Sequence, residues 1–154
     1  MGHKNLIHDI IIKPLEVIAD ERGMVLHMLR EDDAIFKHFG EIYFSVVYPG
    51  VIKGWKRHQR MTQHFAVPVG IIHLVFYDDR KESPTRGRIQ EIITGRDNYA
   101  LIKIPPGIWY GFKGVGRTDA VIANCTDIPH DPAESTQRPV DHHAIPYCWE
   151  KELT

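Results

Sequence analysis

The sequence predicts an all-β fold with little helix, a small jelly roll formed by one domain over residues 1–154. Three observations support this prediction. Short runs rich in β-branched and aromatic residues follow one another, turn-forming residues separate them, and no repeat, low-complexity block or linker divides the chain. Such a series of short strands is typical of a β-sandwich or β-barrel. A chain of 154 residues with 43% hydrophobic composition can also bury a sizeable core.

The expected strands can be followed in order along the chain. The first two are LIHDIII (6–12) and GMVLHML (23–29), and the third, EIYFSVVY (41–48), ends at the turn Tyr48-Pro49-Gly50. The next three are VIKGW (51–55), HFAVPV (64–69) and IIHLVFY (71–77), and the turn Ser83-Pro84-Thr85 comes after them. RIQEIIT (88–94) alternates only partly, ALIKI (100–104) ends at Pro105-Pro106-Gly107, and AVIANC (120–125) completes the series.

Two segments depart from this pattern. EDDAIFKHF, from Glu31 to Phe39, is the one run for which we predict a helix. After Thr126 prolines become frequent, which indicates an ordered loop with one more short strand or helix. Because several of the strands are apolar on both faces, we expect one sheet surface to pack against a second subunit in a homodimer.

The composition narrows the choice of partners and compartment. The formal charge is −1 and the pI about 6.8, so we expect no binding to nucleic acid or to an anionic membrane. No apolar run approaches the roughly 20 residues of a membrane span, and MGHKNLIHDIII lacks the charged start and long apolar region of a signal peptide. Cys125 and Cys148 form no C-x-x-C pair and no disulfide framework. These features predict a cytoplasmic protein.

The stretch GVIKGWKRHQRMTQHFAVPVG, from Gly50 to Gly70, resembles the first motif of the cupin superfamily. The two terminal glycines keep the spacing of that motif, and its metal-ligand positions fall on Lys56, His58 and Gln63. The second cupin motif, Pro-x-Gly-x-x-His, places Tyr110 where the last ligand would be. Divalent metals in such sites need three or four nitrogen or oxygen donors, and an ammonium group repels them. We therefore expect neither a metal nor any other cofactor.

Several further motifs resemble those of the dTDP-4-dehydrorhamnose 3,5-epimerase family, a metal-free group of cupins. Asp20-Glu21-Arg22-Gly23 is similar to the family's D-x-R-G, and Ser45 followed by Gly50-Val51-Ile52-Lys53-Gly54 is similar to its approach to the active site. The family's S-P-T-x-G motif is matched by Ser83-Pro84-Thr85-Arg86-Gly87. Its I-P-x-G-x-x-H-G-F motif is matched, apart from the histidine, by Ile104-Pro105-Pro106-Gly107-Ile108-Trp109-Tyr110-Gly111-Phe112. The order and spacing of these short motifs together indicate a cupin-type jelly roll.

This resemblance implies epimerisation of a nucleotide-linked sugar, yet four functional positions differ. The family's histidine base falls on Lys56, and its tyrosine acid falls in the segment 125–130, which holds no tyrosine. A lysine near the nucleotide phosphates is replaced by Gln63, and a glutamate by His27. Because a fold alone does not specify chemistry, the activity depends on what replaces these groups.

Four residues are the candidates for the proton-transfer steps that epimerisation needs. If VIKGWKRHQ is a strand, Lys56 and His58 project from one face, and His58 has the ordinary pKa of a useful base. Tyr110 is a candidate acid or donor to an enolate, and His130 is a candidate substitute for the missing tyrosine. A purely structural role is the alternative. Lys56 and His58 would then form a hydrogen-bonded polar pair inside the barrel, with Glu41 as partner.

The candidate substrate-binding residues are mostly basic. Lys53, Lys56, Arg57 and Arg60 lie within eight residues, and Arg22 precedes Gly23. Lysine and arginine side chains of this kind hold diphosphates. Gly54 is a candidate site for a β-bulge that would turn Lys53 and Lys56 towards one cavity. Gln63 and Glu41 complete the set. The same charges would also suit a solvated strand edge that resists aggregation.

Three classes of function remain open from the sequence. The leading one is a metal-independent epimerase or isomerase of a dTDP-4-keto-6-deoxyhexose, in carbohydrate or polysaccharide biosynthesis. A sugar 3,4-ketoisomerase is a related alternative, although its usual H-x-H pair is interrupted at Lys56. A non-catalytic cupin that binds a sugar or nucleotide sugar belongs to a different class, and the missing base and acid favour it. A metal-dependent dioxygenase-type cupin is the third possibility.

Overall fold

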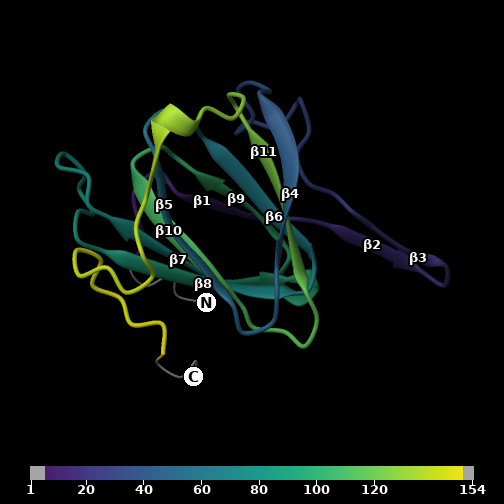
Figure 1. The fold of residues 1–154 in the computed structure, drawn as a ribbon. Coiled ribbons are helices and arrows are strands. Elements are labelled where there is room, and N and C mark those ends of the chain that lie inside the picture. Colours follow the sequence, from purple (N-terminus) through teal and green to yellow (C-terminus); the bar gives the residue numbers. More distant parts are fainter. Residues whose placement is uncertain (1–5, 151–154) are drawn as a thin grey trace.

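The apolar runs of the sequence form two antiparallel sheets that lie face to face (Figure 1). A computed structural model describes residues 6–150, and the following strands lie within that range. One sheet has the spatial order β1 (Ile11–Pro14), β9 (Ala100–Ile104), β6 (Gln63–Val69), β11 (Ala120–Thr126) and β4 (Glu41–Val47). The other has the order β12 (Ser135–Gln137), β5 (Ile52–His58), β10 (Ile108–Gly114), β7 (Ile71–Asp78) and β8 (Ile89–Gly95). This arrangement confirms the prediction of an all-β, cupin-type jelly roll.

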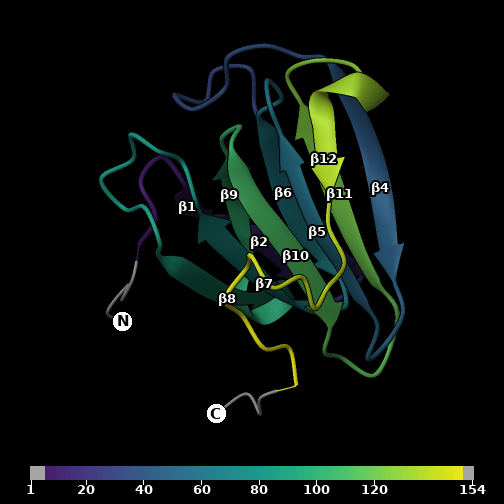
Figure 2. The same cartoon turned by 60° about the vertical axis from the view of Figure 1, so that its left-hand side comes forward.

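The strand β7 shows why the sequence runs are apolar on both faces. Ile72, Leu74 and Phe76 point between the two sheets and join the main core, since alternate side chains of a strand face opposite ways. On the outer face, Val75 packs with a second cluster that contains Trp55 and Trp149. The C-terminal segment after β12 supplies that cover, and Figure 2 shows it crossing in front of β10 and β7. The chain itself therefore buries this outer face.

A β-bulge distinguishes the pairing of β5 with β10. Tyr110 lies opposite Lys56 whereas Gly111 lies opposite Gly54, so Trp55 is an extra residue on β5. Because a bulge resets the alternation of the following side chains, Lys53 and Lys56 both face inward despite their odd separation. A Cβ atom on Gly54 would lie 2.9 Å from the Cα of Gly111, which explains the glycines at this crossing. The bulge expected at Gly54 is confirmed.

The predicted helix over Glu31–Phe39 is wrong. That segment forms turns without helix, and Asp33 stabilises them. Its carboxylate accepts hydrogen bonds from the Nζ of Lys13 at 2.7 Å and from the backbone N–H of Ile35 at 3.4 Å. Aspartate competes in this way with helical hydrogen bonds, and a helix this short is only marginally stable on its own.

The C-terminal segment agrees with its prediction. It contains a 3-10 helix, η2 (Pro132–Glu134), and the short strand β12. A second 3-10 turn, η1 (Arg96–Asn98), follows β8. Within residues 6–150, no helix has the length and apolar character that crossing a membrane requires.

A hairpin of β2 (Val17–Asp20) and β3 (Gly23–Leu26) projects from the two sheets, at the right of Figure 1. Its exposed side chains include Val17, Ile18, Met24 and Val25. Such a set of apolar side chains in solvent is unusual for a monomer.

Candidate functional site

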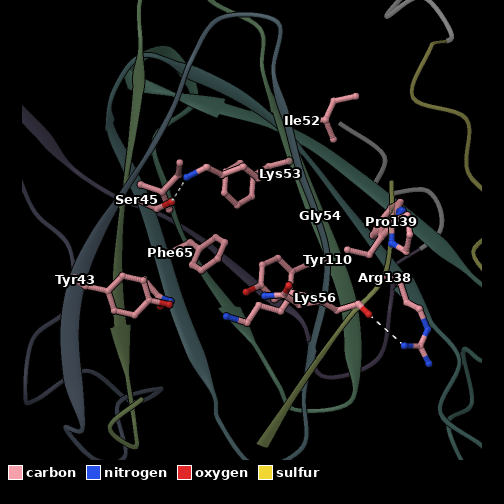
Figure 3. A pocket seen from close by; sticks show the side chains of 15 residues that line it. Tyr43, Ser45, Ile52, Lys53, Gly54, Lys56, Phe65, Tyr110, Arg138 and Pro139 are labelled. Atoms are coloured by element: carbon pink, nitrogen blue, oxygen red, sulfur yellow. Dashed lines mark hydrogen bonds between the residues drawn. The ribbon is translucent and has the colours of Figure 1, made fainter. Parts of the chain in front are cut away.

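The two sheets enclose a cavity of about 710 Å³ at the side where β4 and β5 face each other. Figure 3 shows its lining side chains converging from both sheets. The lining residues are Tyr43, Ser45, Ile52, Lys53, Gly54, Trp55, Lys56, Phe65, Tyr110, Phe112, Ile122, Asn124, Gln137, Arg138 and Pro139. A cavity of this size accommodates a small organic ligand.

The basic wall of the cavity comes from β5. Lys53 and Lys56 both line it, as the bulge requires, and Lys53 donates a hydrogen bond to the Oγ of Ser45 at 3.2 Å (Figure 3). Arg138, just after β12, also lines the cavity, but its guanidinium group lies 5.7 Å from the ring of Trp109 on the outer face and donates to the backbone carbonyl of Gln137. Two lysines thus border one cavity in a chain whose net charge is close to zero. This concentration of positive charge is suited to an anionic ligand.

His58 and Glu134 form a buried acid–base pair beyond Lys56 on the inner face. The Nδ1 of His58 contacts the Oε1 of Glu134, and both side chains are almost fully buried. Oε2 of Glu134 accepts the backbone N–H groups of Gln59, Arg60 and Met61 at 3.0–3.2 Å. The carboxylate is thereby fixed, and it holds Nδ1–H of His58 as the donor.

Burial and hydrogen bonding determine the charges of this pair. Burial lowers the pKa of His58, outweighing the opposite effect of Glu134. For Glu134, burial would raise the pKa, but hydrogen bonds from His58 and the backbone N–H groups keep it below its ordinary value. At neutral pH the pair is therefore a neutral imidazole beside a carboxylate. The Nε2 of His58 is buried and has no partner within residues 6–150.

A second polar network crosses the inner end of the cavity. Tyr110 donates its O–H to the Oε1 of Gln63 at 3.2 Å, and Asn124 donates from Nδ2 to the same oxygen at 3.0 Å. The Nδ2 of Asn124 also lies 2.9 Å from the hydroxyl oxygen of Tyr43. Burial raises the pKa values of Tyr110 and Tyr43, so both phenols are protonated at neutral pH.

The predicted site residues on β5, β6 and β10 come together around this cavity. Lys53, Lys56 and Tyr110 line it. His58 lies further in than Lys56, its ring parallel to that of Tyr110 with centroids 6.2 Å apart. Gln63 is buried behind the wall and acts through its hydrogen bonds to Tyr110 and Asn124.

Five other predicted residues lie away from the cavity, among them Arg60, which pairs with Asp131. Arg57 points to the outer face of β5, where it stacks on Trp109 and binds Asp79. Arg22 lies in the turn of the projecting hairpin, paired with Asp20. Glu41 accepts the backbone N–H of His130 at 2.8 Å, and the exposed His130 does not line the cavity.

Three residues were missed from the sequence, namely Tyr43, Asn124 and Glu134. A signal existed for Tyr43, because it lies two residues before Ser45 and therefore on the same face of β4. The sequence held no such signal for Glu134, because this residue lies 76 positions after His58 in an irregular segment.

The residues at the former ligand positions do not suit a metal ion. Two of these positions carry Lys56 and Tyr110, and the remaining imidazole binds Glu134. Within the described part of the chain, no three His, Cys, Asp or Glu side chains are close enough together to hold one.

The model of one protein family, dTDP-4-dehydrorhamnose 3,5-epimerase, matches residues 4–154. The chain belongs to this family. A crystal structure of a dTDP sugar isomerase from Desulfovibrio desulfuricans is 53% identical, with a TM-score of 0.91 and coverage of 93% of this chain and 92% of that one. A dTDP-4-dehydrorhamnose 3,5-epimerase of Bacillus anthracis, solved with TDP and PPi bound, is 20% identical, with a TM-score of 0.81 over 94% of this chain and 87% of that one.

Two curated proteins are also similar over nearly their full length. Agl13 of Haloferax volcanii, named a probable low-salt glycan biosynthesis epimerase, is 35% identical over 96% of this chain and 97% of its own. SpsL of Bacillus subtilis, named a spore coat polysaccharide biosynthesis protein, is 31% identical over 96% of this chain and 99% of its own.

Proposed function

We propose that the chain is a nucleotide-sugar epimerase, which exchanges protons next to the C4 ketone of a dTDP-4-keto-6-deoxyhexose for glycan or polysaccharide synthesis. The observation that carries this proposal is the cavity between the sheets, which two lysines line and beside which a buried neutral histidine is held by a carboxylate. Family membership and the names of Agl13 and SpsL support it.

The inner face of β5 supplies the base in this proposal. His58 is the proton acceptor, because its imidazole is neutral and Glu134 stabilises the imidazolium that forms. Its Nε2 has no exposed surface without substrate, and catalytic contacts of this kind often form only in the substrate complex. Glu134 is a positioning residue. Lys56, on the cavity wall, stabilises the negative charge that develops on the ketone oxygen, as preorganised cations do in enolate chemistry.

The substrate's diphosphate is assigned to Lys53. This lysine lines the cavity, and its ammonium group attracts a phosphate as a point charge. The reaction is proposed to proceed without metal, because Lys56 replaces a ligand by a cation. The free thiols of Cys125 and Cys148 suit a reducing cytoplasm, where we place the enzyme.

The proposed assembly is a homodimer. Ile42, Phe44 and Val46 point outward from β4 and remain 42–66% exposed, as are several apolar side chains of the β2–β3 hairpin. A second copy that covers these surfaces would bury them, as expected from the doubly apolar strands.

Proton exchange in deuterium oxide tests the proposed reaction. The wild-type protein is incubated with a dTDP-4-keto-6-deoxyhexose, and deuterium at C3 and C5 is followed by NMR. We expect uptake at one or both carbons well above the enzyme-free control. Uptake no faster than that control would remove the epimerase, and appearance of a 3-keto product would indicate the ketoisomerase instead.

A non-catalytic binder is the second candidate, and the enclosed Nε2 of His58 favours it. Calorimetry with dTDP and with the keto sugar separates the two functions. Tight binding without proton exchange would support the binder, whereas binding with exchange supports the enzyme.

A further inference from the structure

The cavity holds a phenol on the wall opposite β5. Tyr43 is on β4, where side chains alternate strictly, with Ile42 and Phe44 exposed and Tyr43 and Ser45 facing inward. Figure 3 shows Tyr43 entering from the β4 side and Lys56 from the β5 side. The two strands belong to different sheets, so these groups approach a bound ligand from different directions.

The hydrogen-bond network distinguishes Tyr43 from Tyr110. Tyr110 donates its only hydroxyl proton in a hydrogen bond to the Oε1 of Gln63. That oxygen also accepts Nδ2–H of Asn124, whose second N–H is donated to the hydroxyl oxygen of Tyr43 at 2.9 Å. A phenol has one proton and accepts through its lone pairs. Tyr43 thus receives a hydrogen bond, and its own proton has no acceptor within residues 6–150.

The donation from Asn124 also prepares Tyr43 to release that proton. A hydrogen bond to a phenol oxygen stabilises the phenolate that remains, and this contact opposes the effect of burial on the pKa of Tyr43. Asn124 is itself 2% exposed and fixed by Gln63. The chain Tyr110–Gln63–Asn124–Tyr43 therefore orients one free O–H at the cavity wall.

From this geometry we infer that Tyr43 is the catalytic proton donor, taking the place of the tyrosine that is absent from residues 125–130. The inference rests on the proposed epimerase function. Inversion needs a proton removed from one face of a carbon and a proton returned to the other face. Tyr43 enters from β4, on the opposite side of the cavity from β5, the strand that carries His58, and this arrangement meets that requirement.

The step balances without any further reactant. The base takes the proton from the carbon next to the ketone, the C–H electron pair forms the enolate C=C bond, and the ketone oxygen takes the negative charge. The enolate then re-forms the ketone as the carbon takes the Tyr43 proton on the opposite face. Tyr43 regains a proton from water, and the base releases its proton to water.

Tyr43→Phe tests this role in deuterium oxide, with epimer formation and deuterium uptake measured separately. Without the donor, the base can still remove the proton and return deuterium to the same face. We expect epimer formation to fall about 100-fold or more, the range for loss of a general acid. Recovered substrate of unchanged configuration should still take up deuterium at a rate within about tenfold of the wild type.

Two further variants sharpen the result. Tyr48→Phe removes a hydroxyl from an exposed tyrosine outside the cavity, and it should leave epimer formation unchanged. Tyr110→Phe should lose less than about tenfold, because its proton is already committed to Gln63. Melting temperature and dTDP affinity confirm that each variant is folded and binds.

The outcomes separate this inference from the proposed function. A wild-type protein that neither exchanges nor epimerises overturns the epimerase itself. An active wild type with Tyr43→Phe forming epimer within about threefold of its rate overturns only the role of Tyr43. A larger loss in Tyr110→Phe than in Tyr43→Phe would assign the donor to Tyr110 and also contradict the inference.

Discussion

His58 and Glu134 show how single residues in this chain depend on contacts far along the sequence. The imidazole was predictable from its place in the cupin motif, but the carboxylate that fixes it lies in an irregular segment. Conversely, Arg57 belonged to a convincing basic cluster and lies on the outer face with Asp79. Sequence spacing indicates which face a strand residue occupies, whereas it does not reveal partners from distant loops.

Glu134→Gln should destabilise the protein by about 1–3 kcal/mol at pH 7.5, because buried donors lose a charged acceptor. The wild type should also lose stability in acid. Both pKa values of the pair lie below their ordinary values of 6.5 and 4.5, so the unfolded chain binds more protons and stability falls as the pH drops through and below this range.

Urea unfolding at pH 7.5 and pH 4 measures both effects. The wild type should be less stable at pH 4 than at pH 7.5, and the variant should stay acid-sensitive because its His58 loses the carboxylate that raises the pKa of the imidazole. Equal stability of the two proteins at pH 7.5 would contradict the buried pair.

Among the elements, β5 and its bulge were predictable from the sequence, and so was the shared inward direction of Lys53 and Lys56. Gly54 indicated a bulge, and the register confirms that Lys53 and Lys56 share a face. The strands β2 and β10 were not among the predicted runs. β10 is interrupted by Gly111, which sequence patterns treat as a break but which the close approach to Gly54 requires.

The S-P-T-x-G motif illustrates another limit at this scale. It marked the family, yet the structure gives it a role in the turn between β7 and β8. Ser83 and Thr85 donate from their hydroxyl groups to the buried carboxylate of Asp78 at 2.5 and 2.7 Å. The motif thus shapes a connection, and none of its residues lines the cavity.

Lys53→Ala and Arg57→Ala compare two cations from opposite faces of β5. Loss of Lys53 removes a charge from the cavity, so the affinity for dTDP should fall about 5- to 100-fold, the range for one charged contact of roughly 1–3 kcal/mol. Arg57→Ala should change it by less than about twofold. Calorimetry at fixed ionic strength measures both values, and equal losses would contradict the inward turn made by the bulge.

For the whole molecule, the jelly roll followed from the order of strand and turn signals, and the site between its sheets did not. The cavity exists because β4 and β5 face each other from different sheets, and a pairing of this kind is a property of topology. The outer cover by the C-terminal segment is equally non-local, since Trp149 reaches back to Trp55.

Light scattering tests the proposed dimer. The wild type should have twice the mass of one chain at micromolar concentration, and Phe44→Glu should shift it towards monomer, because a charge in an apolar interface is costly. Ile93→Glu places the same charge on an exposed apolar position of β8 and should leave the dimer intact. A monomeric wild type, or identical behaviour of the two variants, would contradict this interface.

The proposed reaction requires that a base on the inner face of β5 removes a proton from a bound keto sugar. The most direct measurement is the rate of deuterium uptake by the dTDP-linked keto sugar with wild type and with His58→Gln. We predict an uptake at least about 100-fold slower in the variant, with dTDP affinity changed by less than about threefold. Uptake at the wild-type rate in folded His58→Gln protein would contradict the account.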